Sequence, residues 1–256
     1  MDFGEGVAIL VDFMEEDEKC DYKPEKTTWK AILKGDGGKL GDNLGNKPNA
    51  SCVAELSSTA YPSQAHHLIP NARLNPAATG AKKNPPHPVH ELLIKGDYLY
   101  ADTDYDINHK NNGKWMPYAH ALNEWITGAT KKNDIACNKA LMFDVMSVAQ
   151  IQLHQGSHSY EKFGVGEAGY LTRVNEYLDQ IRDNAISHFG GAFKCAECSE
   201  KKSKKGGLYP PRENTIRYFD KASELIEKDI NKCRIFVSEA ASKFHQDIGF
   251  TMENNT

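Results

Sequence analysis

Residues 63–70 read SQAHHLIP, and the two adjacent histidines in this stretch are the strongest clue to the fold and its chemistry. On an extended segment, neighbouring side chains point in roughly opposite directions. His66 and His67 therefore face different ways. One imidazole can then bind a metal ion while the other meets a bound water or a substrate.

A second informative segment is residues 106–117, which read DINHKNNGKWMP. The dipeptide Asn112-Gly113 is a strong turn signal, and it predicts a short hairpin between the segments on either side of it. An asparagine side chain at this position can orient an imidazole by accepting its second N–H.

A third segment, residues 153–160, reads LHQGSHSY and holds two histidines four positions apart. On a helix His154 and His158 share one face, so their ring nitrogens can meet a single metal ion. Gly156 between them leaves an alternative open, in which the helix is broken and His154 lies in a loop.

Taken together, the three segments resemble the AHH branch of the HNH/endonuclease VII superfamily, which are nucleases with the ββα-metal fold. The resemblance covers about residues 60–182. The matching residues are Ala65 to Pro70, Asp106 to Asn108, Asn112-Gly113, Met116-Pro117, His154, Gly156, His158 and Tyr160. The chain departs from its relatives at Glu161, where Asn is usual, at Met116, where Leu is usual, and in a long insertion between the first two blocks.

The resemblance implies an α+β protein in which a small ββα-metal nuclease motif is embedded in a largely helical domain. It implies that His66 is a metal ligand and His67 the general base, with the reverse assignment as the alternative. His154 and His158 complete the metal site, and Asn112 orients His67. We expect one divalent ion, which is zinc, nickel, manganese or magnesium.

The function that the resemblance implies is hydrolysis of DNA phosphodiester bonds by a one-metal mechanism. AHH domains commonly occur as toxins of bacterial secretion systems, including type VI, so a cognate immunity protein and a secretion-system carrier are the expected partners. Two alternatives stay open: an RNase toxin on the same scaffold, and a non-catalytic zinc-binding module.

The composition of the chain limits how such a protein can bind nucleic acid. The chain has 256 residues and a formal net charge of -4, so a contact must come from a local basic patch or a metal rather than from bulk charge. Its longest early apolar run is five residues, at 7–11. We therefore expect no membrane span and no signal peptide. The expected localisation is synthesis in a bacterial cytoplasm and delivery into the cytoplasm of a target cell.

Residues 194–205 combine a cysteine pair with a cluster of lysines. The CxxC spacing of Cys195 and Cys198 predicts half of a structural zinc site, because such a site needs four ligands. The remaining ligands come from Cys52, Cys137, Cys233 or His188. The candidate phosphate contacts are Lys201, Lys202, Lys204, Lys205 and, in the helix after the histidines, Arg173.

The apolar spacing predicts a loop-rich first half with short strands and a mostly helical second half. Helices are expected over 7–20, 136–151, 169–188 and 212–246, and loops over 35–49 and 75–90. We divide the chain into an N-terminal segment (1–59), the nuclease core (60–188), and a cysteine-pair loop with a C-terminal helix (189–256).

Overall fold

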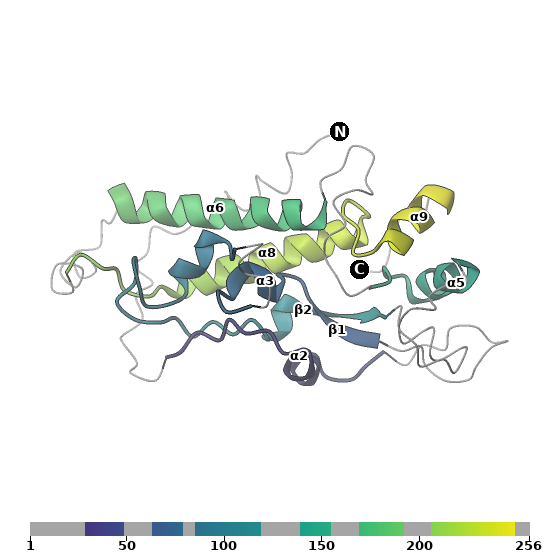
Figure 1. The fold of residues 1–256 in the computed structure, drawn as a ribbon, viewed down its shortest axis with the longest axis horizontal. Coiled ribbons are helices and arrows are strands. Elements are labelled where there is room, and N and C mark those ends of the chain that lie inside the picture. The colour runs from purple at the N-terminus through teal and green to yellow at the C-terminus, as the bar shows by residue number, and fades with distance from the viewer. Residues whose placement is uncertain are drawn as a thin grey trace. The chain divides into compact units, whose positions relative to one another are not determined.

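The computed structural model describes residues 29–48, 63–78, 85–118, 139–154, 169–191 and 206–248 (Figure 1). The chain forms two compact units that interleave along the sequence. We call residues 36–68, 113–173 and 226–256 the strand unit, and residues 1–35, 69–112 and 174–225 the loop unit. The expected boundaries at 59 and 188 stay a prediction.

The strand unit contains a two-stranded antiparallel sheet. Strand β1 (Ser63–His67) pairs with β2 (Gly113–Pro117) in a register that runs from Ser63 opposite Pro117 to His67 opposite Gly113. The hairpin expected around Asn112-Gly113 is therefore wrong, because β2 pairs with a distant segment. The residues just before β2 form the short 3-10 helix η2 (Lys110–Asn112), so they cannot form the first strand of a hairpin with β2.

Helix α2 (Gly37–Leu44) packs against both strands. The loop expected over 35–49 is thus wrong for these residues. Asp36 caps the helix, since its Oδ1 accepts hydrogen bonds from the backbone of Gly38 and Lys39. The helix approaches β2 so closely that a Cβ atom on Gly113 would lie 2.5 Å from Leu40 Cδ1. A larger residue at the start of β2 would therefore displace the side chain of Leu40.

Two shorter helices complete the strand unit. Helix α5 (Lys139–Ala149) contacts β2 and helix α9 (Glu239–Ile248), and the rings of Phe143 and Phe244 lie 4.9 Å apart. The helix expected over 136–151 is confirmed at α5. No helix within the described ranges is long and apolar enough to cross a membrane.

Two long helices contribute residues to both units, and their buried positions follow helical spacing. Helix α6 (Tyr170–Gly191) confirms the expected helix over 169–188. Its buried residues are Tyr170, Val174, Tyr177, Leu178, Ile181 and Ala185. The expected helix over 212–246 is instead two helices, α8 (Glu213–Asn231) and α9. The chain turns between them at Cys233, whose φ of 53° is left-handed.

The loop unit is built from irregular chain that packs on parts of α6 and α8. It includes the short helices α3 (Asn71–Leu74) and η1 (Pro88–Leu92). The backbone of Ile32 forms hydrogen bonds with the residues before and after Asp106. Its N–H donates to Tyr105 O at 2.8 Å, and its carbonyl accepts from Ile107 N at 2.9 Å. The aromatic ring of Tyr105 lies 5.0 Å from that of Phe219 on α8.

Helices combined with a small antiparallel sheet confirm the expected α+β class. The helix expected over 7–20 lies outside the described residues. The loop expected over 75–90 holds for its described part except at its end, where η1 begins at Pro88.

Candidate metal centre and active site

Strand β1 places the two adjacent histidines in different surroundings. His66 is 2% exposed, whereas His67, the last residue of the strand, is partly exposed. Because side chains alternate along a strand, the two imidazoles belong to opposite faces of the sheet. His66 is paired with Lys114 of β2 and His67 with Gly113. The opposite orientation expected for the two histidines is thus what this strand produces.

A second histidine of the strand unit, His154, contacts the imidazole of His66. His154 donates its backbone N–H to Pro117 O at 2.8 Å, which holds it beside the end of β2. Its ring centroid lies 4.6 Å from that of His66, with the ring planes at 62°. His154 is 7% exposed, and this burial lowers the pKa of its imidazole to about 4. The neutral imidazole that burial favours is also the form that binds metals.

Tyr170, the first residue of α6, contacts His66 from another side. Its hydroxyl donates a hydrogen bond to Leu68 O at 2.6 Å and lies 3.1 Å from His66 Nε2. The side chain is fully buried, and burial raises the pKa of this phenol. No motif in the sequence marks Tyr170 as a site residue. The available signal was its helical spacing with Val174, which predicts only that it faces inward.

The donor set suits a divalent metal as far as the structure describes it. His66 and His154, two of the three expected ligands, lie in contact as buried imidazoles. The third, His158, lies outside the described residues. No group of three or more His, Cys, Asp or Glu that could hold a metal occurs within those residues. Two imidazoles fit zinc, nickel or manganese, and a third ligand is needed to complete a site.

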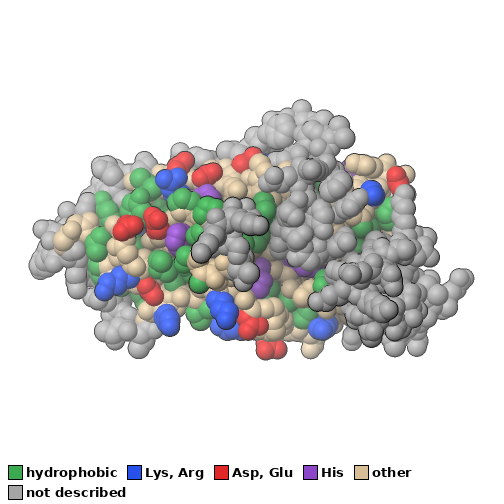
Figure 2. Space-filling model, in the orientation of Figure 1, with side chains coloured by type: hydrophobic (Ala, Val, Ile, Leu, Met, Phe, Trp, Pro, Cys, Tyr) green, Lys and Arg blue, Asp and Glu red, His purple; other side chains and the backbone are tan. Residues whose placement is uncertain are grey.

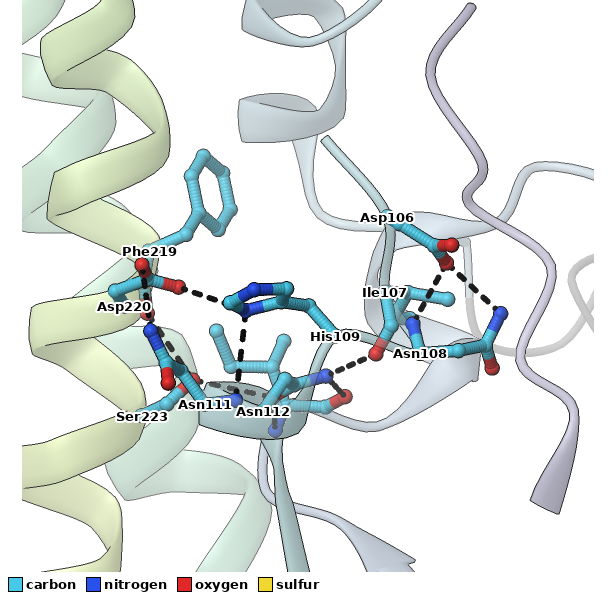
Figure 3. A network of polar contacts seen from close by, with 10 residues as sticks. Asp106, Ile107, Asn108, His109, Asn111, Asn112, Phe219, Asp220 and Ser223 are labelled. Carbon is cyan, nitrogen blue, oxygen red and sulfur yellow. Dashed lines mark hydrogen bonds and ion pairs between the residues drawn. The ribbon is translucent and has the colours of Figure 1, made fainter. Parts of the chain in front are cut away.

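Asn112 has a structural role that its place in a turn dipeptide does not predict. It is 1% exposed, and its Oδ1 accepts hydrogen bonds from Ile69 N at 2.7 Å and Ser223 Oγ at 3.1 Å. Its Nδ2 donates to Ile107 O at 2.9 Å (Figure 3). It also donates to Ile69 O at 3.2 Å. These four bonds use the full capacity of the amide. Within the loop unit Asn112 therefore holds two chain segments and α8 together. Its expected role in orienting His67 stays a prediction.

The residues just before Asn112 make a second, more exposed group of contacts. Asn111 donates to Asp220 Oδ2 at 2.9 Å, and His109 Nδ1 lies 3.9 Å from Asp220 Oδ1 (Figure 3). Burial raises the pKa of the Asp220 carboxyl. His109 is half exposed. This group ties η2 to α8, and it leaves His109 as a surface residue of the loop unit.

The expected phosphate contacts are only partly described. The side chain of Arg173 is 13% exposed, and its Nε lies 3.5 Å from the buried carboxylate of Asp229. The same carboxylate lies 3.4 Å from Arg234 Nη1. This pairing gives Arg173 a structural role in the strand unit, and its contact with phosphate stays a prediction. On the face drawn in Figure 2, basic and acidic side chains of the described residues are interspersed.

Several predicted residues lie outside the described ranges. They are the cysteines Cys195 and Cys198 and the lysines Lys201, Lys202, Lys204 and Lys205. Of the further candidate zinc ligands, Cys233 is described and is buried.

Two polar side chains near the histidines were also missed. Lys114 lies on the same face of the sheet as His66, and its Nζ contacts Glu227 Oε1 at 2.6 Å and Asn231 Oδ1 at 2.9 Å. Gln152, two residues before His154, is buried and anchors the segment that carries it. Its amide bonds the backbone of Ile230, Ile235 and Val237 at 2.7, 2.8 and 3.0 Å. No sequence pattern marks either residue, because their partners lie far away in the chain.

Residues 53–188 match the model of a family described as AHH, a nuclease family of the HNH/ENDO VII superfamily with conserved AHH. No curated protein and no solved structure matches the chain.

Proposed function

The chain belongs to the AHH family of nucleases in the HNH/ENDO VII superfamily, and from this premise we propose that it is a metal-dependent endonuclease that hydrolyses DNA. The supporting observation is the contact between the buried imidazoles of His66, on β1, and His154, whose ring centroids lie 4.6 Å apart. We propose that these residues and His158 hold one divalent ion.

In this mechanism His67 is the general base. It ends β1 and is partly exposed, so its imidazole can reach a water molecule that buried His66 cannot. His67 takes a proton from that water as the oxygen attacks phosphorus, and the bond from phosphorus to the leaving oxygen breaks. A divalent ion, when bound, supplies positive charge that stabilises the charge developing on the phosphate. The remaining protein groups position these histidines.

The choice of DNA rests on the family resemblance, since hydrolysis at phosphorus does not distinguish ribose from deoxyribose. The biological setting is also a proposal. It is an antibacterial toxin that is carried by a secretion system such as type VI and neutralised in the producing cell by an immunity protein. Expression of the chain inside a bacterium tests toxicity directly. We expect growth arrest with the wild type and normal growth with His67→Ala.

A cleavage assay with purified protein tests the proposed activity. Metal-stripped protein is mixed with supercoiled plasmid or with RNA, and zinc, nickel, manganese or magnesium is added in turn. We expect metal-dependent nicking of the plasmid, and its loss in His67→Ala with folding and metal binding retained. The matched control is His109→Ala, which removes a half-exposed histidine of the loop unit and should retain activity.

Every other outcome of the cleavage assay or of the His67→Ala variant contradicts one part of the proposal. Cleavage of RNA alone replaces DNA with RNA as the substrate. Absence of cleavage with every metal refutes the catalytic proposal and leaves a zinc-binding module. Wild-type activity in His67→Ala refutes the assignment of the base. Loss of metal binding in that variant means that His66 and His67 have exchanged roles.

We propose in addition a structural zinc held by Cys195 and Cys198. Metal analysis of a variant in which His66 and His158 are both alanine separates this zinc from the catalytic ion. We expect about one zinc per chain to remain. Its absence refutes the structural site.

A further inference from the structure

The hydroxyl of Tyr170 lies between two polar groups, the carbonyl of Leu68 and the imidazole of His66. Its Oη is 2.6 Å from Leu68 O and 3.1 Å from His66 Nε2. A phenol carries one proton, and a backbone carbonyl can only accept a hydrogen bond. The single proton of Tyr170 is therefore donated to Leu68, which is also the shorter of the two contacts.

In its contact with His66, the Tyr170 hydroxyl is therefore the hydrogen-bond acceptor. Tyr170 presents an oxygen lone pair to Nε2, so Nε2 must carry a hydrogen for the contact to be favourable. A neutral imidazole that is protonated on Nε2 has its lone pair on Nδ1. The contacts on one side of the ring thus determine which nitrogen can bind a metal on the other side.

We propose that Tyr170 is a positioning residue that holds His66 as the Nε2–H tautomer, so that His66 binds the metal ion through Nδ1. The inference rests on the proposed function, because it assumes that His66 is a metal ligand. A metal-binding histidine usually donates its second N–H to an acceptor, which orients the ring and raises its basicity. Here that acceptor is a hydroxyl whose own proton is engaged by Leu68.

The arrangement links three parts of the strand unit through one short chain of hydrogen bonds. Leu68 directly follows β1, His66 lies within β1, and Tyr170 begins α6. All three residues are buried, so water does not compete for these contacts. Loss of the Tyr170 hydroxyl should therefore disturb both the tautomer and the orientation of the His66 ring.

The tautomer can be measured without any cleavage assay. The full chain is labelled with ¹⁵N at histidine, stripped of metal and studied above neutral pH by long-range ¹H–¹⁵N correlation. The signals of His66 are identified by their loss in His66→Gln. We expect Nε2 to be protonated in the wild type. Addition of zinc chloride should shift the Nδ1 resonance while the Nε2 proton is retained.

Tyr170→Phe should give a mixture of His66 tautomers and weaken zinc binding about tenfold or more, as is typical when the partner of a ligating histidine is removed. Tyr105→Phe is the matched control. Tyr105 is also buried, and its hydroxyl has no hydrogen-bond partner among the described residues. This control should keep both the wild-type tautomer and the wild-type zinc affinity.

The inference is overturned if wild-type His66 is protonated on Nδ1, a result that needs no variant and holds even if Tyr170→Phe does not fold. It is also overturned if Tyr170→Phe keeps the wild-type tautomer and affinity, or if Tyr105→Phe loses as much affinity. A protein with the expected His66 signature that cleaves neither plasmid nor RNA refutes the proposed function and supports the role of Tyr170.

Discussion

Replacement of Asn112 by alanine tests whether this residue is chiefly a structural support. Its side chain makes four buried hydrogen bonds within the loop unit. Two join Ile107 O and Ser223 Oγ (Figure 3), and two join the backbone N–H and carbonyl of Ile69. Alanine makes none of them. If Asn112 acts only by orienting His67, the substitution lowers activity and leaves stability almost unchanged.

The expected cost follows from the groups that lose a partner. A buried polar group left unsatisfied costs about 1–3 kcal/mol. Ser223 keeps an acceptor, because its hydroxyl also donates to Phe219 O at 3.0 Å. The N–H of Ile69 and the carbonyls of Ile69 and Ile107 each lose a hydrogen-bond partner. The two carbonyls tolerate this loss better than the N–H does. We therefore expect Asn112→Ala to lower the free energy of unfolding by about 3–5 kcal/mol.

Urea unfolding followed by far-ultraviolet circular dichroism measures this change as a lower midpoint at an unchanged slope. Asn111→Ala is the matched control, since it removes the neighbouring, exposed amide and its one bond to Asp220. We expect that control to cost less than about 1 kcal/mol. An Asn112→Ala protein that unfolds within about 0.5 kcal/mol of the wild type would falsify the structural role.

Three further predictions concern the strand unit and its connection to the histidines. Gly113→Ala should destabilise the protein by about 1–3 kcal/mol in urea, because its Cβ would lie 2.5 Å from Cδ1 of the fully buried Leu40. Gly96→Ala, with no atom within 4 Å of its Cβ, should be within about 0.5 kcal/mol of wild type, and equal effects of the two would contradict this packing. In metal-free protein, the folded pKa of His154 is about 4 and its unfolded pKa is about 6.5, so its stabilising contribution is complete above pH 6.5 and about 3 kcal/mol is lost as the pH falls to 4. Urea midpoints at several pH values should show a steeper acid loss for wild type than for His154→Gln, and identical slopes would rule out a buried neutral His154. Gln152→Ala should cost about 2–4 kcal/mol, because it removes three buried hydrogen bonds to the backbone, and a change below about 0.5 kcal/mol would show that these bonds are not needed.

Short-range patterns in the sequence were sufficient for helices α5 and α6 and for the different surroundings of the two adjacent histidines. The apolar spacing of Val174, Leu178 and Ile181 predicts one face of α6, and all three side chains are buried. The adjacent histidines predict two imidazoles with different surroundings, because side chains alternate on a strand. Both inferences depend only on residues that are close together in the chain.

Local patterns failed where a distant contact decides the conformation. Residues 37–44 contain glycines and asparagine and favour a loop, yet they form α2, which is capped by Asp36 and packs on the strands. The turn signal at Asn112-Gly113 gave no information about the partner of β2, which is the strand that ends at His67. Strand pairing depends on hydrogen bonds that any extended segment can supply, so the partner is chosen by the whole fold.

The sequence by itself determined that the chain carries an AHH segment with histidines suited to metal and proton chemistry. Only the tertiary structure decided which polar groups surround them. The hydroxyl of Tyr170 reaches His66 across 104 positions of sequence, and Asn112 reaches Ser223 across 111. A hydrogen bond depends on the distance and direction between two atoms, and these are set by how the strands and helices pack rather than by spacing along the chain.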